Sequence, residues 1–288
     1  MIYIFLSACC SVTVSVFLKL ARRYHIDIYQ AITWNYSMAI ILTWLFYRPQ
    51  LGSLSSAPTY IYTVLGILLP LLFVVLGTAV KFSGIVRTDI AQRLSLLIPL
   101  IASFLLFSES LSILKVIGLL VGLGAIICLV IKPGQYNHNR SYKNSWIYLL
   151  IVFVGMGVID VLFRQMALIK GMSFTASLFV VYVLSFAVSL IGLIGLVITK
   201  RIKFTFRHIG FGWILGIVNF ANILFYLRAH QALANSPSTV FSAMNIGVIA
   251  LGALIGFIIF KEKLSNVNKA GIALAIVAVI ILTFSQMH

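Results

Sequence analysis

The chain has 288 residues, of which 62% are hydrophobic and 9% are charged, and its mean hydropathy is +1.12. This composition excludes a soluble domain, because a chain of this length has no room to bury so many apolar residues beneath a polar surface. The formal net charge of +16 would indicate nucleic acid binding in a soluble protein, but membrane proteins collect lysine and arginine in their cytoplasmic loops. We therefore expect the lipid bilayer, and no nucleic acid, as a partner.

Ten apolar stretches follow one another along the chain, and each is close to the roughly 20 residues that cross a bilayer as a helix. A helix satisfies its own backbone hydrogen bonds, which lipid does not do. The sequence therefore predicts an all-α integral membrane protein with ten transmembrane helices. The predicted spans cover residues 1–20, 29–46, 60–82, 85–107, 111–131, 146–168, 175–199, 209–233, 237–260 and 269–285.

The last five stretches read as a diverged copy of the first five, which divides the chain into a repeat over 1–132, a linker over 133–145 and a repeat over 146–288. Each half has five spans, an odd number, so the second copy enters the membrane from the opposite side. Such inverted five-helix repeats around a central cavity are typical of secondary transporters. The matched residues are Ile2 with Ile147, Ser15 with Asp160, Lys19 with Arg164, Tyr36 with Tyr182, Gln92 with Asn245, Glu109 with Glu262, Leu111 with Leu264 and Gly118 with Gly271.

The basic residues are distributed unevenly among the loops. Loops that follow odd-numbered spans hold 14 lysines and arginines, whereas those that follow even-numbered spans hold 3. Because cytoplasmic loops are the basic ones, this bias places the odd loops in the cytoplasm and both termini outside.

Polar residues recur at helical spacing on several spans, which indicates faces that avoid lipid and line a cavity. In the first span Ser11, Ser15 and Lys19 are each four residues apart. Hydroxyl groups also bond to their own helix or bridge neighbouring helices, so packing is the alternative for any single serine. The fifth and tenth spans carry few polar residues and are predicted to be peripheral. Further cavity candidates are Asn35, Tyr36, Gln92, Tyr182, Asn219, Asn222, Tyr226 and Asn245.

Ionisable residues inside the spans form two pairs with a spacing of four, Asp89 with Arg93 and Asp160 with Arg164. A charge at the bilayer centre costs on the order of 2.5–3.5 kcal/mol, so such residues are rarely incidental. Each pair could neutralise itself on one helix face. Alternatively, the pairs exchange partners with a substrate or a proton, which makes Asp89 and Asp160 the candidates for proton coupling.

Two basic side chains in the spans have no such neighbour. Arg228 lies inside the eighth span and is a candidate for substrate binding. Lys19 lies near the end of the first span, where its long side chain could reach either the interface or a ligand. His230 is interpreted as either a packed histidine or a proton relay.

Glycine and proline predict how the helices pack. Gly118 and Gly122 form a GxxxG motif in the fifth span, and Gly252 and Gly256 form another in the ninth. Close helix packing explains both, and a homodimer through spans five or ten is a further hypothesis. A proline inside a span, such as Pro99, removes a backbone donor and favours a kink.

Catalytic and cofactor motifs are absent from the sequence. There is no GxxxxGK[ST] motif for ATP and no HExxH motif for zinc, and the five histidines are scattered. Cys9, Cys10 and Cys128 lie in apolar spans at a spacing that suits neither a zinc site nor a disulfide framework. We therefore expect no metal, no cofactor and no enzymatic activity.

The chain resembles the drug/metabolite transporter superfamily, EamA type, over nearly its full length. The resemblance is carried by the five-plus-five arrangement, by Pro99 in the fourth span, and by two phrases in register, FSESL over 107–111 and FKEKL over 260–264, followed by Gly118 and Gly271. It implies a carrier in the bacterial inner membrane, with a central cavity walled by spans one to four and six to nine. Members of that family have both termini in the cytoplasm, whereas the loop charges of this chain place them outside.

The predicted function is secondary active transport of a small polar metabolite, such as an amino acid, a sugar or an organic anion, by alternating access at a mid-membrane site. One alternative is a flippase for a lipid or a lipid-linked sugar, which needs an apolar lateral opening. Another is a membrane assembly protein without transport activity.

Overall fold

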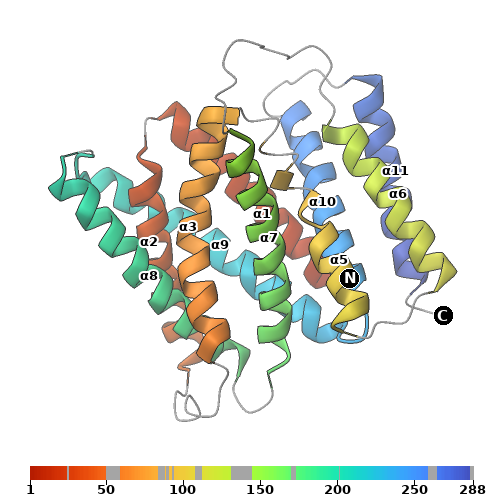
Figure 1. Cartoon of the computed structure of the whole chain (residues 1–288), viewed down its shortest axis with the longest axis horizontal. Coiled ribbons are helices and arrows are strands. Elements are labelled where there is room, and N and C mark those ends of the chain that lie inside the picture. The colour runs from red at the N-terminus through yellow and green to blue at the C-terminus, as the bar shows by residue number, and fades with distance from the viewer. Residues whose placement is uncertain are drawn as a thin grey trace.

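The computed structural model describes residues 1–24, 26–49, 59–83, 88, 91–92, 94–107, 112–130, 145–169, 173–200, 202–258 and 265–285. All the regular elements in these ranges are helices, and each predicted span contains one of them (Figure 1). The helices are α1 (Ile2–Arg23), α2 (Ile28–Tyr47), α3 (Thr59–Ser83), α5 (Leu97–Leu105), α6 (Ile113–Val130), α7 (Ser145–Ala167), α8 (Phe174–Ile198), α9 (Phe206–Ala232), α10 (Pro237–Ile258) and α11 (Asn266–Phe284).

Four of these helices are long and apolar enough to cross a membrane. The qualifying segments are Thr59–Ala79 in α3, Trp146–Ala167 in α7, Phe174–Ile198 in α8 and Phe206–Ala232 in α9. Large hydrophobic side chains such as Leu45, Ile191 and Phe206 are exposed on the outside of the bundle. Water would penalise such a surface and lipid would not, so the structure is that of an α-helical membrane protein.

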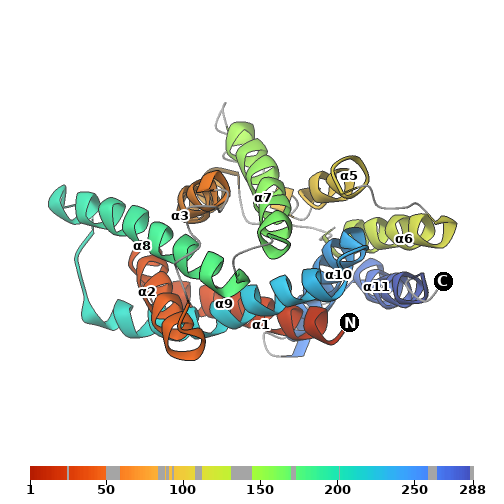
Figure 2. The same cartoon turned by 90° about the horizontal axis from the view of Figure 1, so that it is seen from below.

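The helices form a bundle in which segments far apart in the sequence lie side by side. Figure 2 shows α2 and α8 towards one end of the molecule, and α6 with α11 at the other. α6 packs along α11, and α10 joins this pair to the rest of the bundle. The end position of α6 and α11 agrees with their scarcity of polar residues.

Several of the packing pairs exchange when the first five spans are exchanged with the last five, although the contacts of α10 with α6 and α11 have no comparable counterpart at α5 among the described residues. α1 packs on α9 as α3 packs on α7, and α2 packs on α9 as α3 packs on α8. In the same way, α1 packs on α10 as α5 packs on α7. The remaining principal contacts include α2 with α8, α5 with α10 and α6 with α11, which join helices that correspond to each other in the two halves.

Glycines bring two of these exchanged pairs into close contact. A Cβ atom at Gly216 of α9 would lie 2.7 Å from the Asn35 carbonyl oxygen and 2.8 Å from the Met38 Cβ atom of α2. A Cβ atom at Gly66 of α3 would lie 2.5 Å from the Leu184 Cβ atom of α8. Met38 and Leu184 correspond in the register that matches Tyr36 with Tyr182, so the same contact occurs once in each exchanged pair.

The fourth predicted span is interrupted near its middle. Ser95 and Leu96 form a turn, and α5 begins at Leu97. In an unbroken helix the Ser95 carbonyl would accept from the amide of residue 99, but Pro99 has no amide hydrogen. The Ile98 amide donates to that carbonyl instead, at 3.0 Å, which tightens the backbone at this point.

The GxxxG motif in α6 faces the interior of the bundle. A Cβ atom at Gly118 would lie 2.9 Å from Leu282 of α11, and one at Gly122 would lie 2.5 Å from Ile246 of α10. The glycine face is therefore covered by this chain's own helices. A Cβ atom at Gly252 would meet nothing within 4 Å.

Some predictions concern residues outside the described part of the chain. These are most of the 133–145 linker and the matched residues Glu109, Leu111, Glu262 and Leu264.

Candidate functional site

The interior of this apolar bundle contains polar side chains with buried atoms that have no hydrogen-bond partner among the described residues. Such atoms are rare in native structures, because burying one without a partner costs about 1–3 kcal/mol. Those that belong to two groups in the bundle come from α2, α8, α9 and α10: Asn35 Oδ1, Tyr36 Oη, Tyr182 Oη, Ser185 Oγ, both ring nitrogens of His230, and Ser242 Oγ. Trp34 Nε1 and His208 Nδ1 are also buried without a partner among the described residues, outside these groups.

The first group of these atoms lies where α2 packs on α8. Tyr36 of α2 and Tyr182 of α8 are 1% and 0% exposed, and their hydroxyl groups are close enough to interact electrostatically. The neighbours Asn35 and Ser185 are equally buried.

The second group lies between α7, α9 and α10. The Tyr226 hydroxyl of α9 donates to the Asp160 carboxylate of α7 at 3.1 Å. The Tyr226 ring also makes edge contacts with Phe163 and with His230, whose centroids lie 6.3 and 4.8 Å away. Phe241 of α10 covers His230 at 4.8 Å. Tyr226 and His230 are thus one turn apart on α9, and the Asp160 carboxylate of α7 is bonded to the first of them.

Arg164 belongs to this second group and is 2% exposed. One nitrogen of its guanidinium group donates to the Ala234 carbonyl beyond the end of α9, and the group lies 5.1 Å from the centre of the Phe107 ring. It also interacts electrostatically with Tyr226 and His230. Asp160 and Arg164 therefore bind separate partners, Tyr226 and Ala234, although a helical spacing of four would allow them to face each other.

α9 connects the two groups. Its Phe220 ring lies 6.4 Å from the Tyr182 ring of the first group, and Tyr226 belongs to the second. Six residues of helix separate Phe220 from Tyr226, which is about 9 Å along the axis. This distance is comparable to the length of a small metabolite.

The predicted serine stripe of α1 is only partly buried. Ser7, at the start of the stripe, is fully buried and donates to the side-chain oxygen of Asn222 at 2.8 Å, which ties α1 to α9. Ser11 is half-buried. Ser15 is exposed and donates to the Ser11 carbonyl of its own helix at 3.1 Å. Ser15 therefore bonds within its own helix, as the packing alternative predicted, and does not belong to either group of buried polar atoms.

The remaining candidates are placed at the margins. Asn245 donates to the Phe241 carbonyl of its own helix at 3.0 Å. Arg228 contacts the Tyr47 hydroxyl at 3.4 Å, near the end of α2.

Asn219 and Gln92 are half-buried, and Gln92 precedes the turn that interrupts the fourth span. Asp89, Arg93 and the side chain of Lys19 lie outside the described residues.

Three members of the two groups were not among the cavity residues selected from the sequence: Ser185, Ser242 and His230, the last of which was left open between a packed histidine and a proton relay. The signal was present for the serines, since Ser185 is three residues after Tyr182 and Ser242 is three before Asn245. His230 follows Tyr226 by one turn. Helical spacing identified the helix faces that carry buried polar residues, but it did not show which polar residue on each face is the most buried.

The two groups can bind a ligand through hydrogen bonds and charge. Hydroxyl, amide and imidazole groups offer both donors and acceptors, and Asp160 and Arg164 add one charge of each sign. Among the residues that the structure describes, no three histidine, cysteine or acidic side chains gather as metal ligands would.

Comparison with known proteins gives a relative and a fold. An uncharacterized protein of Haemophilus influenzae is 42% identical over 282 residues, which cover 96% of this chain and 95% of that protein. This chain belongs to the same family. A crystal structure of a protein that is 14% identical superposes with a TM-score of 0.69 over 96% of this chain and 98% of its own, so the two share a fold. No family model matches the sequence.

Proposed function

We propose that this protein is a secondary active transporter of a small polar metabolite and a member of the drug/metabolite transporter superfamily, EamA type. The substrate is an amino acid, a sugar or an organic anion, bound midway through the membrane. Ten helices in two inverted five-helix repeats rock around that site and open it to one side at a time.

The buried polar atoms without partners carry this proposal. A chain that only filled space in the membrane would gain stability by placing leucine at these positions, since each lone polar atom costs free energy. A substrate that donates and accepts hydrogen bonds removes that cost. Binding also explains why the atoms come from both halves, with Asn35 and Tyr36 from the first and Tyr182, Ser185, His230 and Ser242 from the second.

Two features support the inverted repeat. The principal contacts include pairs that exchange when the halves are exchanged, and the contact of Gly216 with Met38 is repeated by Gly66 with Leu184. The interrupted fourth span also fits, because discontinuous helices are common in transporters. The turn at Ser95 and Leu96 interrupts this span, although the Ser95 and Leu96 carbonyls are bonded within the chain.

The residues take distinct roles in this mechanism. Tyr36 and Tyr182 hold the substrate where the halves meet, and Arg164 attracts a carboxylate or phosphate group. Asp160 exchanges a proton, with the Tyr226 hydroxyl as the donor that holds its carboxylate in place. Asp89 remains the second candidate for proton coupling from its place in the sequence.

The proposed location is the inner membrane of a bacterium, with both termini outside. The basic loops after odd-numbered spans support this orientation, because translocation of lysine and arginine is disfavoured.

A pair of tyrosine variants tests the proposal. Tyr182→Phe removes a hydroxyl that has no partner, so the thermal stability of the free protein should be unchanged or higher, whereas stabilisation by substrate should be lost. Tyr62→Phe is the matched control, since its buried hydroxyl bonds to Ser177 at 2.9 Å. Losing that bond should cost about 1 kcal/mol of stability and leave substrate binding intact.

The measurement has two stages. Thermal-shift screening of the purified protein against amino acids, sugars, organic anions and phosphorylated metabolites identifies a ligand, and counterflow in proteoliposomes then measures its transport by each variant. A lipid-linked sugar is included in the screen. Stabilisation by that lipid alone would favour the flippase, and a ligand that binds without being transported would favour an assembly protein. Equal transport by the Tyr182→Phe variant and the native chain would contradict the proposed site.

A further inference from the structure

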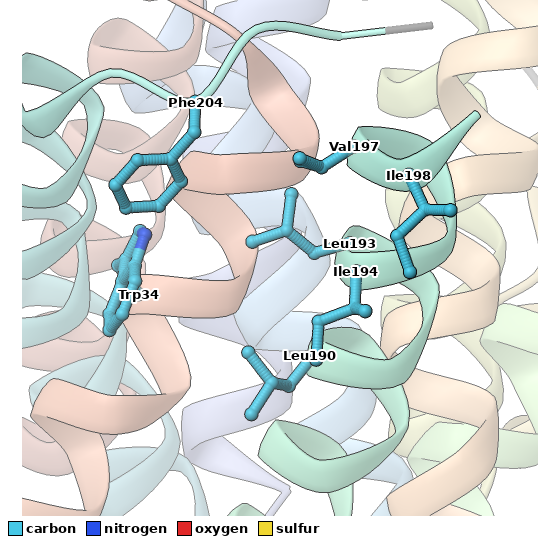
Figure 3. A pocket seen from close by; sticks show the side chains of 7 residues that line it. All are labelled: Trp34, Leu190, Leu193, Ile194, Val197, Ile198 and Phe204. Atoms are coloured by element: carbon cyan, nitrogen blue, oxygen red, sulfur yellow. The ribbon is translucent and has the colours of Figure 1, made fainter. Parts of the chain in front are cut away.

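An apolar pocket of about 180 Å³ lies at the edge of the bundle, away from the two polar groups. Figure 3 shows Trp34 of α2 and Phe204 on one side of it and five aliphatic side chains of α8, between Leu190 and Ile198, on the other. Ile194 and Ile198 are 49% and 73% exposed, so the pocket adjoins the outer surface of the helix. In a membrane, that surface faces lipid chains.

Basic residues surround the end of this pocket. Lys200 follows α8, Lys203 directly precedes Phe204, and Arg207 lies in the first turn of α9; all three are exposed. A buried glutamine fixes this loop on α2, because Gln30 donates to the Lys203 carbonyl at 2.9 Å and accepts from the Thr205 amide at 3.1 Å. The positive charges are therefore held beside the apolar pocket.

Trp34 adds a polar atom to the lining of the pocket. The indole nitrogen of Trp34 has no hydrogen-bond partner among the described residues, and in Figure 3 it lies at the end of the ring nearest Phe204. Trp34 is six residues inside α2 from Ile28, which is about 9 Å along the axis. Tryptophan favours this interfacial depth, where lipid ester carbonyls offer acceptors.

We propose that this pocket holds one anionic phospholipid. An acyl chain occupies the space between Trp34 and α8, an ester carbonyl accepts the Trp34 N–H, and the phosphate and anionic headgroup lie among Lys200, Lys203 and Arg207. Charge complementarity selects an anionic lipid over a zwitterionic one, and basic pockets between helices on the cytoplasmic side commonly bind such headgroups. The lipid is retained as part of the bundle, and it is distinct from the transported metabolite.

Fluorescence quenching by brominated phospholipids tests this site, since bromine on an acyl chain quenches tryptophan on contact. A variant that keeps Trp34 alone (Trp44→Phe, Trp146→Phe and Trp213→Phe) is titrated with brominated phosphatidylglycerol and with brominated phosphatidylcholine. Trp34 should be quenched at lower concentrations of the anionic lipid. Adding Lys203→Gln or Arg207→Gln should reduce that preference by about fivefold each, which corresponds to about 1 kcal/mol per charge.

Trp44 provides the matched control. It belongs to the same helix, is 57% exposed and does not line the pocket, so a variant that keeps Trp44 alone should respond equally to both lipids. Native mass spectrometry of the unmodified chain provides a second measurement and should show one retained phosphatidylglycerol after delipidation. Equal quenching of Trp34 by both lipids, or an unmodified chain that retains no anionic lipid, would overturn the proposal.

Discussion

At the scale of single residues, the contact between Asp160 and Tyr226 combines a charge with a neutral donor in the interior of the bundle. The carboxylate accepts from the Tyr226 hydroxyl at 3.1 Å, and the same tyrosine ring contacts His230. A hydrogen bond of this kind orients the carboxylate and favours its ionised form, whereas burial favours the protonated form. The proposed proton coupling requires that the carboxylate alternate between these two forms during transport.

The variant Asp160→Asn tests the coupling. Asparagine keeps the shape of the side chain and an oxygen that accepts from Tyr226, so the fold should remain intact, but it exchanges no proton. In proteoliposomes, uptake driven by a pH gradient should be abolished, while exchange of substrate across the membrane without a gradient should persist.

Asp27→Asn is the control for this experiment. Asp27 caps the start of α2 by accepting from the Gln30 amide at 3.0 Å, and asparagine serves equally well as a cap. Gradient-driven uptake should therefore be unchanged. If the Asp160→Asn protein still accumulates substrate in response to a pH gradient, Asp160 has no part in coupling.

At the scale of the elements, glycine determines how closely α9 approaches α2. At Gly212 an added Cβ atom would meet the Ala31 carbonyl oxygen at 2.7 Å, and at Gly216 it would meet the Asn35 carbonyl oxygen at the same distance. Backbone oxygens in a helix have little freedom to move. Since Asn35 precedes Tyr36, this close approach also fixes the part of α2 that supplies the first polar group.

Gly216→Ala should therefore lower the stability of the protein by about 1–3 kcal/mol, because the added methyl group forces the two helices apart. Gly210→Ala is the control in the same helix. A Cβ atom there would meet nothing within 4 Å, so alanine should be neutral or stabilise α9 by about 0.5–1 kcal/mol. Thermal unfolding of the purified variants measures both effects, and equal midpoints would show that the contact is not tight in the membrane protein.

At the scale of the whole molecule, the ten proposed crossings place both chain termini on the same side of the membrane. Five spans in each half return the chain to the starting side after ten crossings. The excess of lysine and arginine in the loops after odd-numbered spans supports the proposal that this side is the outside.

Cysteine labelling tests this orientation. In a background without the native cysteines Cys9, Cys10 and Cys128, Ser285→Cys after α11 should react with an impermeant maleimide in intact spheroplasts. Lys203→Cys, in the loop between α8 and α9, should react only after permeabilisation. The opposite pattern would place both termini in the cytoplasm and reverse the expected sides of every loop.

The sequence by itself determined the class of the protein and the positions of its helices. A transmembrane span is recognised from the hydropathy of about 20 consecutive residues. It can therefore be predicted without knowing which other helices pack against it. Each predicted stretch contains a helix in the structure. The interruption of the fourth span fits the missing amide hydrogen of Pro99, but Pro70 lies inside α3 without interrupting it, so a proline alone did not predict the break.

Only the tertiary structure decided which polar residues are buried together. Ser7 and Ser15 belong to the same helical stripe, yet Ser7 bonds to Asn222, 215 residues away, and Ser15 bonds to its own helix. Asn245 and His230 likewise look equivalent in the sequence, but Asn245 donates to the Phe241 carbonyl, while the buried His230 ring has no hydrogen-bond partner in the part of the chain that the structure describes. Burial depends on the rotation of each helix and on the helices packed against it, and neither is encoded within a single span.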